Sequence, residues 1–223
     1  MRILSFKMGG LNPLIQFLKS KGFLIDVVED AEDALSLLAL DYDYKACLYS
    51  DYLFAQKVRD KRIDVPLILF TGVPGSKHVI EELQYGGDCV LRCPIDKNEA
   101  LAYINATIRR CHRITSNVMH VGKLRVDLDA CDVTYDGNMI RLTPSEWNIF
   151  ETLLLAGGRP VSKELIYANL SPDDVHVDGL KLVDVFVCKI NRKFKSFMGE
   201  PITYTVWGRA RGLNFNLLKG GGP

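Results

Sequence analysis

The sequence predicts two domains, an α/β domain with a doubly wound parallel sheet followed by an α+β domain. Three observations predict this arrangement. The length of 223 residues suits two cores of ordinary size. The first half alternates short apolar runs with helical patterns, whereas the second half places most of its helices between two groups of short strands. The order of the elements therefore separates residues 1–112 from residues 120–217.

Five short apolar or β-branched runs predict the strands of the first domain, and a helical pattern follows each of them. The predicted strands are 2–6, 23–29, 44–50, 65–71 and 88–94, and the predicted helices are 11–21, 31–39, 52–62, 76–85 and 97–111. Strands that alternate with helices in this way form a parallel sheet with helices on both faces. Functional groups in such sheets lie at the carboxyl ends of the strands.

The pattern changes after a polar stretch at 113–119, which we interpret as a linker. Residues 120–143 then predict three or four short strands. Thr143 and Glu146 form a capping box at the start of a helix, and Ser162 caps a second helix. A polar loop, a third helix and two strands joined by a turn rich in Gly and Arg complete the domain. Residues 218–223 are expected to form a flexible tail.

The third helix, predicted at 181–197, has an apolar face and a basic face. The apolar side chains recur at helical spacing, at Val183, Phe186, Val187, Ile190, Phe194 and Phe197. The opposite face carries Lys181, Cys188, Arg192 and Lys195, with Lys189 and Asn191 on its flanks. Residues 181–219 hold eight Lys and Arg against two acidic residues, a local charge of +6. This distribution indicates a polyanion site, although a solvated basic face would give the same pattern.

Short strands, three helices and a terminal hairpin, with a basic third helix, predict a winged-helix domain. We expect the apolar face of the third helix to pack on the first two helices and its basic face to lie in the DNA major groove. Arg209 and Arg211 in the hairpin would reach the neighbouring DNA backbone or the minor groove. Trp147 and Trp207 are expected to pack in the core and against the hairpin rather than to stack on bases.

Four segments carry a resemblance to a known family. "LTPSEWNIFETLL", "VSKELI", "VDVFVCKINRKF" and "ITYTVWGRARGLNF" resemble the effector domain of OmpR/PhoB-type response regulators. The resemblance implies a flavodoxin-like receiver domain at 1–112 and a winged-helix DNA-binding domain at 120–217. DNA-facing positions of the family fall on Lys181, Leu182, Cys188, Lys189, Asn191, Arg192 and Lys193 in the helix and on Thr205, Arg209 and Arg211 in the wing. Lys and Arg would mainly hold phosphates, and Asn191 is our candidate for reading a base edge.

The receiver half departs from the family at its phosphorylation pocket. The acidic pair of the family falls on Lys7 and Met8, the phosphoacceptor on Ser50, and the conserved Lys on Cys93. Only Thr71 retains the expected residue type. Mg²⁺ requires oxygen ligands, so the loss of these carboxylates predicts that the pocket binds no metal and that the protein needs no cofactor.

Asp51 is the alternative phosphoacceptor. Strand alternation would aim it away from the pocket, although a loop at the strand end could re-aim it. No acidic pair would then remain opposite to hold Mg²⁺. Lys7 paired with Asp51 or with Asp88 in a permanent salt bridge is a further alternative.

The predicted function is that of a transcription regulator that binds double-stranded DNA without phosphorylation. The resemblance implies a homodimer formed through about 76–111, with RNA polymerase as a further partner. Asp88 and Glu99 fall at interface positions of the family, but Tyr103 replaces an Arg, which predicts an apolar or rearranged dimer. As an alternative, the receiver half is an interaction module that binds a protein or ligand and controls the DNA-binding half.

Other classes of function lack support in the sequence. There is no nucleophile–base pair and no glycine-rich phosphate loop, so we predict that the protein is not an enzyme. Six cysteines without CxxC pairs predict neither a zinc site nor a disulfide framework, which fits the cytoplasm. No apolar run approaches the ~20 residues of a membrane span.

Overall fold

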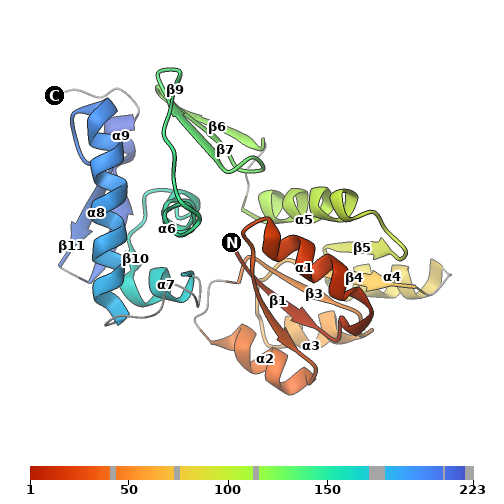
Figure 1. The fold of residues 1–223 in the computed structure, drawn as a ribbon. Helices are drawn as coiled ribbons and strands as arrows, with labels where there is room; N and C mark the ends of the chain where they lie inside the picture. The colour runs from red at the N-terminus through yellow and green to blue at the C-terminus, as the bar shows by residue number, and fades with distance from the viewer. Residues whose placement is uncertain (41–43, 73–75, 113–115, 171–178, 208, 219–223) are drawn as a thin grey trace. The chain divides into compact units, whose positions relative to one another are not determined.

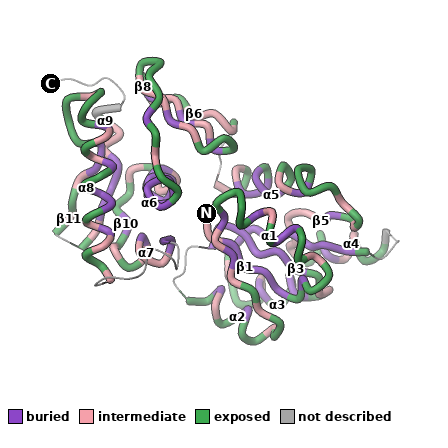
Figure 2. Tube along the Cα trace, in the orientation of Figure 1, coloured by how far each residue is buried: buried purple, intermediate pink, exposed green. Residues whose placement is uncertain are grey.

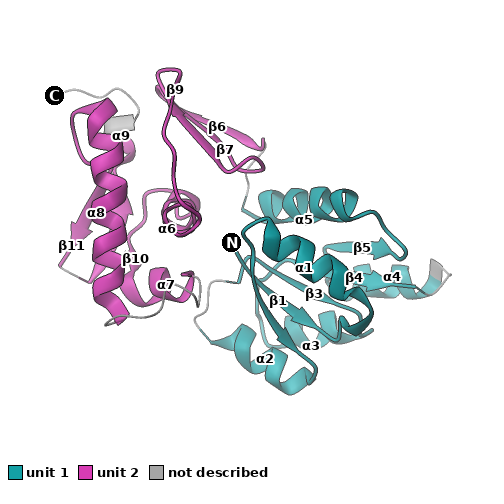
Figure 3. Ribbon diagram, viewed as in Figure 1, with its two compact units in different colours: residues 1–114 teal, residues 115–223 magenta. Residues whose placement is uncertain are grey.

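The computed structural model describes residues 1–40, 44–72, 76–112, 116–170, 179–207 and 209–218. The chain forms two compact units, residues 1–114 and residues 115–223 (Figure 3). The predicted linker, 113–119, extends two residues too far, because Val118 and Met119 already belong to the first strand of unit 2.

Unit 1 is built on a five-stranded parallel sheet with the order β2-β1-β3-β4-β5 (Figure 1). The strands are β1 (Arg2–Phe6), β2 (Leu24–Val28), β3 (Ala46–Tyr49), β4 (Leu67–Thr71) and β5 (Cys89–Arg92). The helices are α1 (Asn12–Ser20), α2 (Ala31–Ala39), α3 (Phe54–Asp60), α4 (Ser76–Gln84) and α5 (Lys97–Cys111), with a 3₁₀ turn, η1 (Gly9–Leu11), before α1. The prediction of a doubly wound sheet is confirmed.

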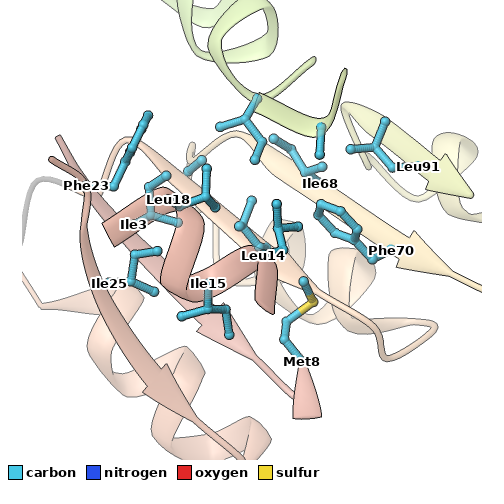
Figure 4. Packing of buried hydrophobic residues seen from close by; sticks show 14 of the residues in the cluster. Ile3, Met8, Leu14, Ile15, Leu18, Phe23, Ile25, Ile68, Phe70 and Leu91 are labelled. Carbon is cyan, nitrogen blue, oxygen red and sulfur yellow. The ribbon is translucent and has the colours of Figure 1, made fainter. Parts of the chain in front are cut away.

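Both faces of this sheet are covered, as the buried strands at the centre of unit 1 show (Figure 2). On one face, α1 and α5 pack on a cluster that includes Ile3, Ile68 and Phe70 (Figure 4). On the other face, α2 and α3 enclose a second cluster around Tyr49 and Phe54. Burial on both sides explains why the central strands are nearly continuous apolar runs rather than alternating ones.

Unit 2 contains two small antiparallel sheets. The first has the order β6-β7-β8-β9, and the second has the order β10-β12-β11. The strands are β6 (Val118–Val121), β7 (Leu124–Asp127), β8 (Asp132–Tyr135), β9 (Asn138–Met139), β10 (Val161–Ser162), β11 (Thr203–Val206) and β12 (Ala210–Leu213). The helices are α6 (Pro144–Leu155), α7 (Lys163–Ala168), α8 (Gly179–Met198) and α9 (Phe215–Leu218). The two sheets, helices α6 to α8 and the terminal hairpin confirm the winged-helix prediction.

The helix starts in unit 2 follow the predicted caps. The Thr143 hydroxyl accepts from the Glu146 backbone N–H, and the Glu146 carboxylate accepts from the Thr143 N–H at 2.7 Å, so the capping box is complete. Ser162 caps α7 through the Leu165 N–H. Helix α9 was not predicted, and it includes Leu218, which we had assigned to the tail. The rest of that predicted tail lies outside the described residues.

Helix α8 packs as its apolar spacing predicts. Its buried side chains are Val183, Phe186, Val187, Ile190 and Phe194, and they face α6 and α7. Phe197 is an exception, because it is 42% exposed. It lies in the last turn of the helix, past the end of the core. Among the described residues, no helix is both long and apolar enough to cross a membrane.

Candidate nucleic-acid interface

The outer face of α8 carries exposed basic side chains. Lys181, Cys188, Lys189 and Arg192 are all exposed, whereas Leu182 is half-buried. The Lys189 ammonium lies 5.0 Å from the centre of the Phe186 ring on the same helix, so its stem covers apolar surface while its charge stays in water. Asp184, Val185, Cys188, Lys189 and Arg192 line a shallow hollow on this face. The exposed face therefore offers cations along about three helical turns.

Asn191 does not face outward. Its amide NH₂ donates to the Thr203 hydroxyl at 2.8 Å, and its carbonyl accepts from the Thr203 backbone N–H at 3.0 Å. Both ends of the amide are thus used to join α8 to the first strand of the hairpin. The placement argues against the predicted base-reading role, because a base edge would have to displace these bonds.

Lys193 also bonds within unit 2. Its ammonium donates to the Glu146 carboxylate at 2.5 Å and to the Arg141 carbonyl at 2.9 Å, which ties α8 to the start of α6. Burial alone would raise the pKa of the Glu146 carboxyl, but the bonds from Lys193 and the Thr143 N–H outweigh it and lower that pKa. Lys193 therefore stabilises the helix packing, and we remove it from the predicted DNA-facing set.

Arg211 belongs to an ionic cluster rather than to the surface of the wing. It is 9% exposed, and its guanidinium donates to the Asp184 carboxylate. The Lys163 ammonium donates to the other oxygen of Asp184 at 2.7 Å. Burial by itself would raise the pKa of Asp184, but these two bonds lower it on balance. The cluster joins α8, α7 and β12, so Arg211 also leaves the predicted DNA-facing set.

The hairpin β11–β12 carries the remaining predicted positions. Thr205 and Arg209 are exposed. The expectation that Trp207 packs against the hairpin is wrong: the side chain is 95% exposed, and its backbone adopts a left-handed conformation with φ 47°. Trp147, in contrast, is buried in α6 as expected.

The receiver pocket at the carboxyl ends of β1, β3 and β4 is occupied by its own side chains. The Lys7 ammonium donates to Asp51 at 3.1 Å, which confirms one of the two salt bridges that we considered. The Ser50 hydroxyl donates to the Lys7 carbonyl, and the Tyr52 and Thr71 hydroxyls are hydrogen-bonded to each other.

Of the two orientations considered for Asp51, the structure has the one set by a loop. Strand β3 ends at Tyr49, so Ser50 and Asp51 lie in the following loop, where strand alternation no longer applies. The carboxylate consequently turns toward Lys7. The other candidate partner of Lys7, Asp88, instead accepts from Arg59 at 2.9 Å and from the Leu67 N–H at 2.8 Å.

Two further positions of the predicted pocket are apolar or nearly so. Met8 is fully buried in the core cluster of Figure 4, where it can bind no cation. Cys93 is half-buried, burial raises the pKa of its thiol, and the Cys93–Pro94 peptide bond is cis. Within the described part of the chain, no group of three or more His, Cys, Asp or Glu side chains is arranged to hold a metal ion.

Helix α4 is fixed by one buried acidic side chain and exposes apolar ones. Glu82 is 1% exposed, and its carboxylate accepts from the Tyr49 hydroxyl and from the Leu53 backbone N–H. Burial raises the pKa of this carboxyl despite those bonds. Ile80 and Leu83 lie on the exposed side of α4, at 52% and 47% exposure.

Comparison with known proteins identifies relatives of both halves. A family model described as "Transcriptional regulatory protein, C terminal" matches residues 137–210. The cell cycle response regulator CtrA of Brucella anthropi is 30% identical over 200 residues, which cover 86% of this chain and 85% of that protein. CtrA of Brucella ovis matches with the same identity and coverage.

Solved structures of response regulators also align with the chain. DrrB of Thermotoga maritima, described as an OmpR/PhoB homolog, aligns with 95% of this chain and 98% of its own at 19% identity and a TM-score of 0.42. The orphan response regulator HP1043 of H. pylori aligns with 49% of this chain and 97% of its own at 26% identity and a TM-score of 0.44.

Proposed function

Because the chain belongs to the family of the cell cycle response regulator CtrA, we propose that it regulates transcription as a sequence-specific DNA-binding dimer without phosphorylation. The observation that carries the proposal is the Lys7–Asp51 salt bridge in the receiver pocket. It places a positive charge beside the carboxylate of Asp51, the alternative phosphoacceptor, where Mg²⁺ would have to bind.

Phosphorylation of an aspartate needs a metal ion or equivalent charge on the phosphoryl oxygens, and a free carboxylate oxygen as nucleophile. Here the Lys7 ammonium is bound to one carboxylate oxygen of Asp51, and a metal ion beside that ammonium would be repelled. Ser50 anchors the same segment by donating to the Lys7 carbonyl. These contacts favour a receiver that holds one conformation by itself.

The proposed DNA contacts are the exposed groups of α8 and the hairpin. Lys181, Lys189, Arg192 and Arg209 supply cations for phosphates, since Lys and Arg hold the DNA backbone in most complexes. Leu182, Cys188 and Thr205 remain in the proposed surface as neutral groups. We exclude Asn191, Lys193 and Arg211 because their polar atoms are used within unit 2.

The proposed dimer forms through the apolar side of α4 and α5. Ile80, Leu83 and Tyr103 are each about half exposed, which is a large apolar surface to leave in water. Asp88 is already bound within unit 1, where one of its carboxylate oxygens accepts from Arg59 and from the Leu67 N–H. An apolar contact is therefore favoured over the charged one implied by the family. We also propose that the protein contacts RNA polymerase and that it is located in the cytoplasm.

The test is selection of DNA by the unmodified full-length chain, followed by titration of the selected and scrambled duplexes at several salt concentrations. The proposal predicts tighter binding to the selected duplex by a factor of about 10³ or more. Equal affinity for both duplexes would contradict sequence-specific binding and would reduce the basic face to a solvated surface.

A further inference from the structure

The loop between β3 and α3, residues 50–53, is held in an unfavourable conformation. Leu53 has φ 68°, in the left-handed region where the Cβ atom of a bulky residue crowds its own backbone. Lys7, which is bound to Asp51 of this loop, is left-handed as well, with φ 52°. Strained backbone of this kind persists only where surrounding contacts hold it, and it clusters at switch regions. The contacts that hold this loop lead to α4.

Glu82 of α4 provides the first of these contacts. Its carboxylate accepts from the Tyr49 hydroxyl at the end of β3 and from the Leu53 N–H, on a residue that is 1% exposed. The space around the pair is filled, because a Cβ atom on Gly87 would lie 3.2 Å from the Glu82 Cγ and 3.4 Å from the Tyr49 hydroxyl oxygen. Burial raises the pKa of this carboxyl, so its charge is kept here at a cost in free energy. That charge joins α4 to β3 and to the loop.

Tyr52, in the middle of the loop, provides the second contact. Its hydroxyl is hydrogen-bonded to the hydroxyl of Thr71, the last residue of β4. Its ring centre lies 5.0 Å from that of His78, in the first turn of α4. One half-buried side chain thus touches both the end of β4 and the start of the helix that follows it.

The loop contacts and the proposed dimer surface lie on opposite sides of α4. His78 and Glu82 are four positions apart, so they share the face of the helix that meets the loop. Ile80 and Leu83 project from the other side, where they are 52% and 47% exposed. A shift or rotation of α4 that broke the loop contacts would therefore displace the apolar side chains of the dimer surface.

We propose that Tyr52 and Glu82 lock α4 to the pocket loop, so that the dimer surface is presented permanently and needs no ligand or phosphoryl group in the pocket. This inference rests on the proposed function, because it concerns the dimer of that proposal. The Lys7–Asp51 salt bridge fixes the loop, and the loop fixes the helix. Tyr52 and Glu82 are positioning residues in this arrangement, since they act through Ile80 and Leu83.

The size of the effect follows from the fraction of molecules that hold α4 in place. When only a fraction of a protein is competent to bind, its apparent dissociation constant rises by the inverse of that fraction. A homodimer needs two competent protomers, so the fraction enters twice. A fall in that fraction to about one third in each protomer would weaken the dimer about tenfold.

The experiment compares the full-length chain with Tyr52→Ala, Tyr52→Phe, Glu82→Ala and Glu82→Gln. Sedimentation equilibrium measures the dimer, and hydrogen exchange measures the opening of α4 and of β1. Both Ala variants should weaken the dimer at least tenfold and speed exchange in α4, while exchange in β1 stays close to that of the parent. The conservative variants should keep more of the dimer, because Tyr52→Phe retains the ring over His78 and Glu82→Gln retains an acceptor oxygen.

Tyr44→Phe is the matched control for the loss of a tyrosine hydroxyl. The Tyr44 hydroxyl donates to Asp26 at 2.7 Å, and Asp26 lies on β2, at the opposite edge of the sheet from β5. The control should leave both the dimer and the exchange of α4 at the parent level. Weakening of the dimer by Tyr44→Phe as strong as that by Tyr52→Ala would contradict a specific role of the loop.

Three other outcomes would overturn the inference. The first is parent-like exchange of α4 in both Ala variants, and the second is faster exchange of α4 with an unchanged dimer. The third is a rise in exchange that is as large in β1 as in α4, since the residues would then support only the stability of unit 1. Failure of the proposed dimer looks different, because the parent itself would sediment as a monomer while the exchange difference in α4 remained.

Discussion

Asp184 determines how α8, α7 and β12 are held together. Its carboxylate accepts from both Lys163 and Arg211, and Arg211 is almost fully buried. Asp184→Asn should destabilise unit 2 by roughly 1–3 kcal/mol, a figure that allows for solvent screening at a carboxylate that is 38% exposed. Urea unfolding of parent and variant at pH 7 measures the difference.

The same substitution makes a prediction about pH. The folded-state pKa of Asp184 lies below its ordinary value of 3.8, so its contribution is present above that pH and is lost as the pH falls through the folded value. The stability difference between parent and Asp184→Asn should therefore shrink below about pH 4. A difference that stays constant from pH 7 to pH 3 would show that the cluster acts through packing alone.

Lys189 and Lys193 form a matched pair that separates DNA contacts from structural ones. Lys189→Ala should lower the melting temperature only slightly, through loss of its contact with the Phe186 ring. It should weaken all duplexes alike and reduce the salt slope of binding by about one unit. Lys193→Ala should leave the salt slope unchanged and cost roughly 1–3 kcal/mol of stability, because it leaves the buried Glu146 carboxylate without its cation. If both variants lower the salt slope equally, the assignment of Lys193 to the interior is wrong.

Predictions from the sequence were wrong most often about single residues. Asn191 is four residues after Val187, and Lys193 is three residues after Ile190, so helical spacing places both beside the apolar face. That spacing was a usable signal, and the resemblance to the family obscured it. The partner of Arg211 is 27 positions away in the chain, and no local pattern indicates such a contact. The exposure of Trp207 depends on the length and twist of the hairpin, which composition does not determine.

At the scale of elements, α4 and α5 carry the proposed dimer surface. Glu82 fixes α4 by bonding to Tyr49, while Ile80 on the same helix faces solvent. Ile80→Glu should weaken the dimer of the full-length chain at least tenfold, since a charge would enter an apolar contact. Sedimentation equilibrium measures the change.

Leu40 supplies the control for this experiment. It is as exposed as Ile80, at 52%, but it follows α2. Helix α2 comes directly after β2, and β2 lies at the opposite edge of the sheet from β5. Leu40→Glu should leave the dimer intact. If Leu40→Glu weakens the dimer and Ile80→Glu does not, the interface lies at α2 instead.

The elements themselves were predictable from sequence. Apolar runs with turn residues between them identify all five strands of unit 1, and the capping box identifies the start of α6. Helix α9 was missed because four residues are too few to show a period. The direction of Asp51 stayed open because it depends on where β3 ends, and strand ends are the least certain part of any sequence-based assignment.

At the scale of the whole molecule, the chain combines a receiver whose pocket is closed by its own lysine with an effector that presents basic groups. The two units fold around separate cores. Losing the pocket chemistry while keeping the five-stranded sheet is consistent with a receiver that serves mainly to bring two effectors together. Linked effectors bind paired half-sites at a high effective concentration, which raises affinity without any new contact.

The most direct test treats the full-length protein with acetyl phosphate and Mg²⁺ and follows one sample by intact mass and by DNA titration. We expect no added phosphate and the same affinity for the selected duplex with and without treatment. A phosphate on Asp51 accompanied by tighter binding would contradict it, since the Lys7–Asp51 salt bridge would then be only the resting state of a working phosphorylation site.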